Sequence, residues 1–177
     1  HGSDDDWLVV LGDVCGKGVE AAVLTGRVRQ ATRTAALVDR SPAQVLDLVN
    51  RVLVSEGEGT FVTALCARVR RRGEDLVMSV SAAGHPPPYL LRASGGLERV
   101  AAEGTVLGLF DTHDYTETEV VLRPGDSCVF FTDGATFGMP WYTTPTLVAG
   151  LISPENTFQR HWSISRPNGR NATLSSA

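Results

Sequence analysis

Gly12-Asp13-Val14-Cys15-Gly16-Lys17-Gly18 directly follows the apolar run 7–11, and this junction decides how the chain begins to fold. The apolar run predicts a buried strand. Asp13 then lies at the carboxyl end of that strand, where its carboxylate can face a cleft instead of the core. Gly16 and Gly18 allow the backbone to turn sharply and to approach a ligand closely. A strand that delivers an acid into a glycine-rich turn suits a divalent cation or a phosphate.

A second predicted strand ends in the same way. The apolar residues 127–131 lead into Thr132-Asp133-Gly134. Two strands that end alike can be neighbours in one sheet, which would bring Asp13 and Asp133 to a common edge. Mg²⁺ and Mn²⁺ prefer such oxygen ligands. Each acid taken alone also fits an ordinary turn, because Asp before Gly is common in turns.

Length, charge and cysteine content limit the classes of function. The 177 residues predict one domain that is long enough to bury a core. The net charge of −4 gives no electrostatic reason to expect nucleic acid as a partner. We expect no membrane span and no signal peptide, and three scattered cysteines favour a reducing, cytoplasmic setting. Cys66 and Cys128 lie in apolar runs and are expected to be small buried hydrophobic residues.

The order of predicted elements favours an α+β fold. Helical spacing of small and apolar residues predicts a helix over 17–37. A second helix is predicted over 42–54, with Ser41 as its N-cap, Pro42 in its first position and Gln44 completing a capping box. Strands follow, and we expect them at 61–69, 76–82, 88–92, 97–100, 119–122 and 127–132. Helices packed on a β-sandwich are the natural architecture for this order.

Two segments differ from this pattern. The basic run Arg70-Arg71-Arg72 precedes Gly73, and we expect it to form a solvated hairpin turn between the predicted strands 61–69 and 76–82. The alternation of apolar residues stops at about residue 139. The sequence therefore predicts a folded domain over 1–138 and a divergent tail over 139–177, which is disordered or arises from a frame change.

Six motifs occur in order along the chain and identify a family resemblance. They are Gly12–Gly18 with Ala21-Ala22, Thr60-Phe61-Val62-Thr63-Ala64, Ala83-Gly84-His85-Pro86-Pro87-Pro88, Gly104-Thr105-Val106-Leu107-Gly108, Pro124-Gly125-Asp126 and Phe131-Thr132-Asp133-Gly134. This set, spanning about residues 7–134, resembles the SpoIIE-like bacterial branch of the PPM (type 2C) metal-dependent serine/threonine protein phosphatases. The resemblance implies an α-β-β-α layered sandwich with two Mn²⁺ or Mg²⁺ ions at one end. It also implies a phosphorylated regulatory protein as substrate, such as an anti-sigma-factor antagonist.

The resemblance also implies roles for individual residues. Asp13 would bridge the two ions, the carbonyl of Val14 would bind one of them, and Asp133 would bind the other. A metal-activated water would attack phosphorus directly, so no cysteine nucleophile is needed and Cys15 is not expected to act as one. His85, which precedes three prolines, is expected to shape a loop instead of transferring protons.

Departures from the family pattern leave more than one function open. The acidic motif that the family places on a preceding strand is missing, as are the glutamate after Thr-Asp-Gly and a late aspartate. We therefore expect a domain truncated at both ends, an unpaired edge on the first strand, and weak metal binding. One hypothesis is a phosphatase of reduced activity, and the alternative is a pseudophosphatase that binds phosphoproteins without turnover. A partial gene product is a third, and the physiological substrate and oligomeric state stay open.

Overall fold

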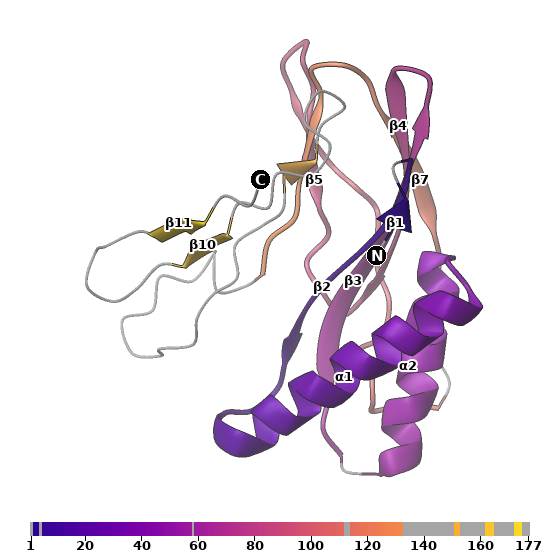
Figure 1. The fold of residues 1–177 in the computed structure, drawn as a ribbon, viewed down its shortest axis with the longest axis vertical. Helices are drawn as coiled ribbons and strands as arrows, with labels where there is room; N and C mark the ends of the chain where they lie inside the picture. The colour runs from indigo at the N-terminus through magenta and orange to yellow at the C-terminus, as the bar shows by residue number, and fades with distance from the viewer. Residues whose placement is uncertain are drawn as a thin grey trace.

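The computed structural model describes residues 2–3, 5–57, 59–111 and 114–132, together with the backbone of three short strands at 151–152, 162–164 and 172–174. Two helices and a set of antiparallel strands make up these parts of the chain (Figure 1). Their bounds in chain order are β1 Gly2–Ser3, β2 Asp6–Val14, α1 Gly18–Val38, α2 Pro42–Glu56, β3 Val62–Arg72, β4 Asp75–Ala83, β5 Tyr89–Leu91, β6 Leu97–Arg99, β7 Thr118–Leu122, β8 Ser127–Val129, β9 Leu151–Ile152, β10 Trp162–Ile164 and β11 Ala172–Leu174.

The first sheet has the order β1-β2-β3-β4-β7, and all its strands pair antiparallel. The predicted hairpin is present as β3 and β4, but its turn is not where we expected it. Arg70, Arg71 and Arg72 belong to β3 and oppose β4, so the turn falls at Gly73-Glu74. The arginines lie on the strand because their backbone continues the ladder with β4, and Arg70 also pairs with Glu119 at 3.4 Å and Arg71 with Asp5 at 3.5 Å.

A second sheet has the order β6-β5-β8-β9. The first and second sheets enclose one core, which we call the inter-sheet core. It contains side chains from both sheets, among them Leu65, Val69, Met78 and Leu90, and also Phe130 directly after β8. Asp126, directly before β8, joins β8 to the residues that follow β5. Its carboxylate accepts hydrogen bonds from Arg92 Nη1 at 2.9 Å and from the backbone N–H of Ala93 at 3.0 Å.

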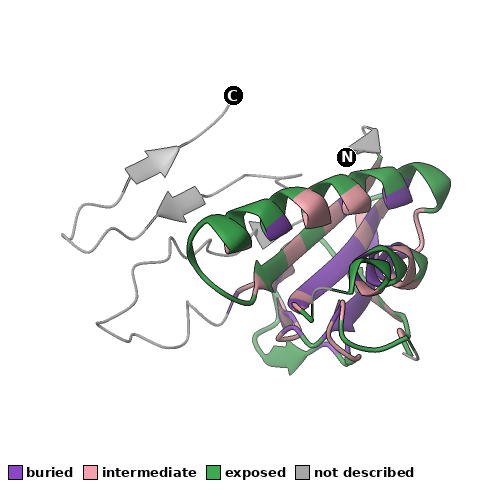
Figure 2. Ribbon diagram, turned by 90° about the horizontal axis from the view of Figure 1, so that it is seen from below, coloured by how far each residue is buried: buried purple, intermediate pink, exposed green. Residues whose placement is uncertain are grey.

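Both helices lie on the other face of the first sheet (Figure 2). They enclose a second core, the helix-side core, which includes Leu24, Leu46, Val49, Val62 and Cys66. The described residues therefore form an α-β-β arrangement, which agrees with the predicted α+β sandwich. None of the helices in the described part is long and apolar enough to cross a membrane.

The start of α2 was predicted correctly. Ser41 is its N-cap, and the side chain accepts a hydrogen bond from Gln44 N at 3.3 Å. The other half of the expected capping box is supplied differently, because Ser41 N donates to Asp39 Oδ1 at 2.7 Å. Glu117 adds a second cap, since its carboxylate accepts from the Ser41 hydroxyl and from Ala43 N.

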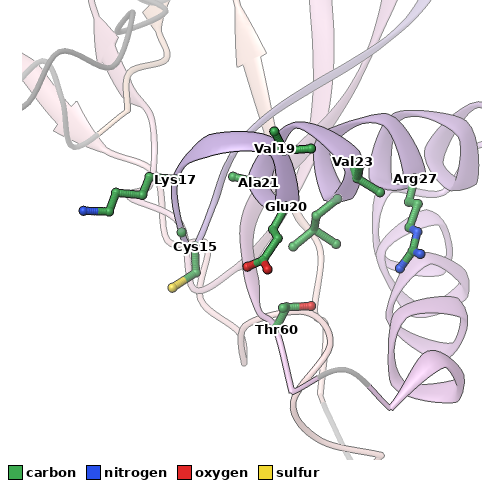
Figure 3. Close-up of a pocket in the computed structure, with 10 residues that line it drawn as sticks. Cys15, Lys17, Val19, Glu20, Ala21, Val23, Arg27 and Thr60 are labelled. Carbon is green, nitrogen blue, oxygen red and sulfur yellow. The ribbon is translucent and has the colours of Figure 1, made fainter.

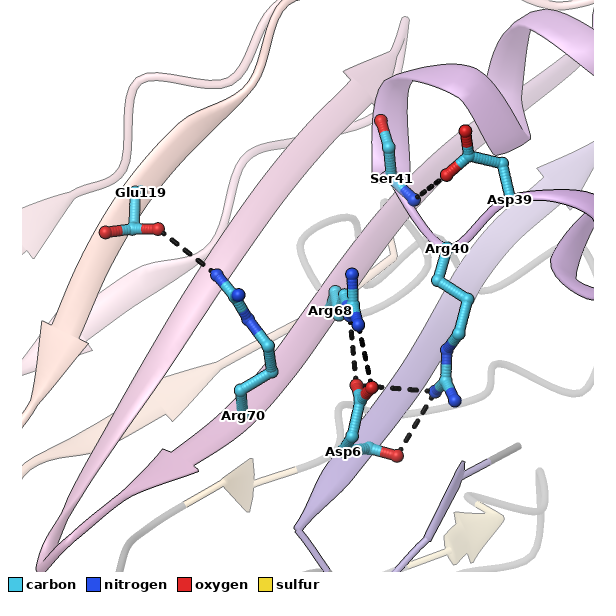
Figure 4. A network of polar contacts seen from close by, with 7 residues as sticks. All are labelled: Asp6, Asp39, Arg40, Ser41, Arg68, Arg70 and Glu119. Atoms are coloured by element: carbon cyan, nitrogen blue, oxygen red, sulfur yellow. Dashed lines mark hydrogen bonds and ion pairs between the residues drawn. The ribbon is translucent and has the colours of Figure 1, made fainter.

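An ion-pair network connects β2 to β3 and to the link between the helices (Figure 4). Asp6 on β2 accepts two hydrogen bonds from Arg68 on β3, at 3.0 and 2.8 Å, and pairs with Arg40 at 3.5 Å. The hydrogen bonds from Arg68 hold the pKa of Asp6 below its usual value, against the opposing effect of burial. Asp6 therefore joins the sheet to the link between the two helices.

The outer edge of β2 is covered only at its beginning. β1 pairs with Asp6 and Trp7, and no other strand of the described residues pairs along that edge. Within the described residues, β2 beyond Trp7 therefore pairs with β3 alone, and the expected unpaired edge stays a prediction for the rest of the chain. In the 139–177 segment, β9 pairs with β8 and β10 pairs with β11. The remainder of the expectation for that segment lies outside the described residues.

Candidate metal centre

Asp13 lies one residue before the end of β2, on the side of the strand that faces the second sheet. Trp7, Val9 and Leu11 pack against the inter-sheet core, and side chains two residues apart on a strand share a face. Asp13 continues this row but is exposed, because it lies beyond the packed part of the core. Its cross-strand neighbour on β3 is Thr63. Asp13 is therefore an exposed residue near the carboxyl end of β2, and whether its carboxylate faces a cleft stays a prediction.

The backbone around Asp13 is shaped by two glycines. A Cβ on Gly12 would lie 2.4 Å from the carbonyl oxygen of Thr63, so only glycine lets β2 run this close to β3. Gly16 has φ +114°, a conformation that side-chain-bearing residues rarely adopt, and it turns the chain from β2 toward α1. The glycine-rich stretch thus places Asp13 and the carbonyl of Val14 directly before a sharp turn.

His85 connects this strand pair to the segment that follows β8. The imidazole is 5% exposed. Its Nδ1 is 3.1 Å from Thr63 Oγ1, and its Nε2 is 3.1 Å from the carbonyl oxygen of Phe131. Phe131 is held further by stacking on Tyr89, with ring centroids 5.8 Å apart. The side chain of His85 therefore links Thr63, the cross-strand neighbour of Asp13, to Phe131, which lies one residue before the end of the described segment 114–132.

Asp133 lies outside the described residues, so its distance from Asp13 stays a prediction. The last described residue before it, Thr132, is buried. Sequence reasoning gave His85 a loop-shaping role, and its two hydrogen bonds agree with that. The role of Thr63 was missed. Its motif was recognised, but only the strand register reveals that Thr63 opposes Asp13 and contacts His85.

Beside this turn is a half-open pocket of about 580 Å³ (Figure 3). Its wall combines the turn itself, at Cys15 and Lys17, with the first half of α1 and with Thr60. The side chain of Lys17 points away from the pocket, whereas that of Glu20 points toward Thr60. The pocket therefore presents mixed charge and apolar surface, with no single chemistry that dominates.

The other two cysteines are structural. Cys66 and Cys128 are fully buried, and burial raises the pKa of the Cys66 thiol well above its usual range. Burial also raises the pKa of Cys128 to about 12. Both are therefore protonated at neutral pH and behave as the small hydrophobic residues that we expected.

The donors in this region fit a hard divalent cation in kind. An exposed carboxylate from Asp13 and a backbone carbonyl from Val14 are both oxygen ligands, which Mg²⁺ and Mn²⁺ prefer. Among the described residues, no three His, Cys, Asp or Glu side chains gather closely enough to hold a metal by themselves. Asp133, which the sequence predicts as a further ligand, lies outside the described residues.

The family model for stage II sporulation protein E (SpoIIE) matches residues 3–147 of this chain. That range contains the whole of 7–134, the segment that carries the six motifs, and it extends into the first part of the tail.

One curated relative and two solved structures illustrate the similarity. The phosphoserine phosphatase RsbU of Bacillus subtilis is 29% identical over 130 residues, which cover 72% of this chain and 38% of RsbU. The solved RsbU and RsbW domains of Rv1364c from Mycobacterium tuberculosis align with a TM-score of 0.62 and 29% identity, covering 73% of this chain and 36% of that chain. The SiaA-PP2C domain of Pseudomonas aeruginosa aligns with a TM-score of 0.64 and 26% identity, covering 76% of this chain and 53% of that chain.

This chain thus spans less than two thirds of the length of each of these relatives. More distant solved structures include RsbX in complex with magnesium, at 15% identity, and PstP in complex with 2 manganese ions, at 17% identity. At that level of identity, these two structures show the fold alone.

Proposed function

Since the chain belongs to the stage II sporulation protein E (SpoIIE) family, as the ordered motifs indicated, we propose that it is a metal-dependent serine/threonine phosphatase domain. The substrate we propose is phosphoserine or phosphothreonine in a bacterial regulatory protein, of the anti-sigma-factor antagonist type. The similarity to RsbU, which is named as a phosphoserine phosphatase, supports this substrate class. It also favours the enzyme over the pseudophosphatase alternative. A cytoplasmic setting belongs to the same proposal.

One observation carries the proposal. Asp13 is an exposed residue near the end of β2, before a glycine turn, and its neighbour Thr63 is joined through His85 to the segment after β8. This is where the family resemblance requires a bridging carboxylate. Asp13 and the Val14 carbonyl would hold Mn²⁺ or Mg²⁺ from one strand, and Asp133 would hold them from the other. Such ions, when bound, lower the pKa of water and neutralise charge on phosphoryl oxygens.

The residues of the chain then have defined tasks in hydrolysis. Asp13 provides negative charge at a fixed place, because Gly12 lets β2 lie tightly against β3. Gly16 turns the chain sharply soon after Asp13, and the proposal has a phosphorylated side chain approach the exposed residue there. Water attacks phosphorus, the P–O bond to the serine or threonine breaks, and the side-chain oxygen leaves and takes up a proton. No covalent enzyme intermediate is required, so the Cys15 thiol has no part in the reaction.

The proposal is tested by hydrolysis of a phosphoserine peptide during a Mn²⁺ titration. We expect activity that requires the metal, disappears with chelator and resists thiol alkylation. Asp13→Ala should abolish it, because a bridging carboxylate serves both ions. Glu74→Ala is the matched control, since Glu74 is an exposed acid in the β3–β4 turn. Full turnover in chelator would overturn the proposal. Phosphopeptide binding without turnover at any Mn²⁺ concentration would instead identify a pseudophosphatase.

A further inference from the structure

We infer that His85 is a positioning residue that sets the spacing between the Asp13–Thr63 strand pair and the segment ending at Thr132. This inference rests on the proposed function, because its importance lies in aligning ligands for the metal ions. The evidence is the pair of hydrogen bonds that the imidazole makes, one with each side.

The partner on one side of His85 determines which ring nitrogen donates. The carbonyl of Phe131 can only accept a hydrogen bond, so Nε2 of His85 must carry the proton. In the neutral ring, Nδ1 is then an acceptor, and the hydroxyl of Thr63 donates to it. A neutral Nε2–H imidazole therefore satisfies both contacts at the same time. Neither contact alone would fix the distance between the two segments.

The backbone holds His85 where these contacts require it. The preceding Gly84 has φ +65°, and a Cβ there would lie 2.3 Å from Cγ1 of Val106. Gly84 N also donates to the carbonyl of Gly104 at 2.7 Å. The three following prolines, 86–88, have restricted φ angles. The imidazole is thus a rigid spacer on a rigid loop, and not a side chain free to move with its partners.

Loss of either hydrogen bond should therefore affect metal binding more than folding. Thr63 is the cross-strand neighbour of Asp13, so the two side chains stand on the same face of the sheet, and we expect the position of one to affect the other. Residues that support the ligands of a metal from outside typically change metal affinity by ~10- to 100-fold when they are removed. A purely structural role would instead lower the free energy of unfolding and leave metal affinity unchanged.

The test measures Mn²⁺ binding by titration calorimetry and the ring tautomer by long-range ¹H–¹⁵N NMR on the full chain. Wild-type His85, assigned by comparison with His85→Gln, should carry a proton on Nε2. Thr63→Val keeps the shape of the side chain but removes the hydroxyl, and should weaken Mn²⁺ binding by ~10-fold. Thr63→Ser keeps the hydroxyl and should bind within a few-fold of the wild type. His85→Gln should weaken binding at least as much as Thr63→Val, and provides a second variant if Thr63→Val folds poorly.

Val80→Ala is the matched control, because Val80 is fully buried in β4 and belongs to the inter-sheet core. It should lower the free energy of unfolding without changing Mn²⁺ affinity. An Nδ1–H tautomer in the wild type, or unchanged Mn²⁺ affinity in both Thr63→Val and His85→Gln, would overturn the inference alone. A wild-type chain that binds no Mn²⁺ would overturn the proposed function and this inference with it.

Discussion

Helices α1 and α2 cover the same face of the first sheet, but they are attached to it very differently. α2 has 15 residues, of which six are buried. α1 is longer, at 21 residues, but only Leu24, Ala35 and Ala36 are buried in it. Its first turns expose apolar side chains, with Val19 80% and Val23 50% exposed.

The ends of the two helices differ in the same direction. α2 has a side-chain N-cap at Ser41 and ends at Gly57 in the left-handed conformation that commonly closes helices. The N-cap of α1 is Lys17, which makes no side-chain capping hydrogen bond. The comparison teaches that α2 and the sheet form the rigid scaffold, whereas α1 begins weakly at the turn that follows Asp13.

The largest expected difference is in side-chain truncation. Leu46→Ala removes a side chain of α2 that is 1% exposed, and should lower the free energy of unfolding by about 3 kcal/mol. Val23→Ala removes half-exposed surface from α1 and should cost no more than about 0.5 kcal/mol. Urea unfolding followed by circular dichroism measures both. Similar losses for the two variants would contradict the contrast between the helices.

A smaller difference is expected at the N-caps. Ser41→Ala should destabilise the protein by about 1 kcal/mol, because it removes the acceptor for Gln44 N. Lys17→Ser should do the opposite and stabilise it by up to about 1 kcal/mol, because it introduces a cap that α1 lacks. The same urea experiment applies. If Lys17→Ser were destabilising, the backbone N–H groups at the start of α1 would already have other hydrogen-bond acceptors.

The smallest expected effect concerns the link between the helices, where Arg40 contacts Asp6. The pKa of Asp6 is lowered from 3.8, chiefly by its hydrogen bonds with Arg68. A lowered pKa means that Asp6 stabilises the fold fully above about pH 4, and that this stabilisation is lost as the pH falls through the lower, folded-state value. The difference in unfolding free energy between wild type and Asp6→Asn should therefore shrink between pH 4 and pH 2.

Asp114→Asn is the control for that experiment, because Asp114 is exposed. Its difference from the wild type should stay near zero over the same pH range. A difference for Asp6→Asn that grows on acidification would mean that the carboxylate is a net cost to the folded state.

The features that the sequence predicted well are local ones. The start of α2 was predictable because Ser41, Pro42 and Gln44 carry the capping signal within four residues. The position of Asp13 was predictable because an apolar strand and a glycine turn adjoin it. The hairpin turn was misplaced because the run Arg70-Arg71-Arg72 does not show from its sequence that its backbone pairs with residues 75–77 of β4.

The non-local part of the candidate site could not be predicted in the same way. The contact of His85 with Thr63 depends on the register of β2, β3 and the loop after β4. No periodicity in the chain specifies that register by itself. The resemblance indicated which residues belong to the site, whereas only the structure shows that Thr63 opposes Asp13 and contacts His85.

The cap that Glu117 places on α2 has a consequence for the order of folding. The carboxylate contacts Ala43 N at 3.0 Å across 74 residues of chain, directly before β7 begins. Ser41 can cap α2 as soon as the helix forms, whereas Glu117 can do so only after β7 has docked on β4 and closed a long loop. We therefore expect this contact to form late in folding, after the transition state, and to slow unfolding. Its removal should speed unfolding and leave the folding rate nearly unchanged.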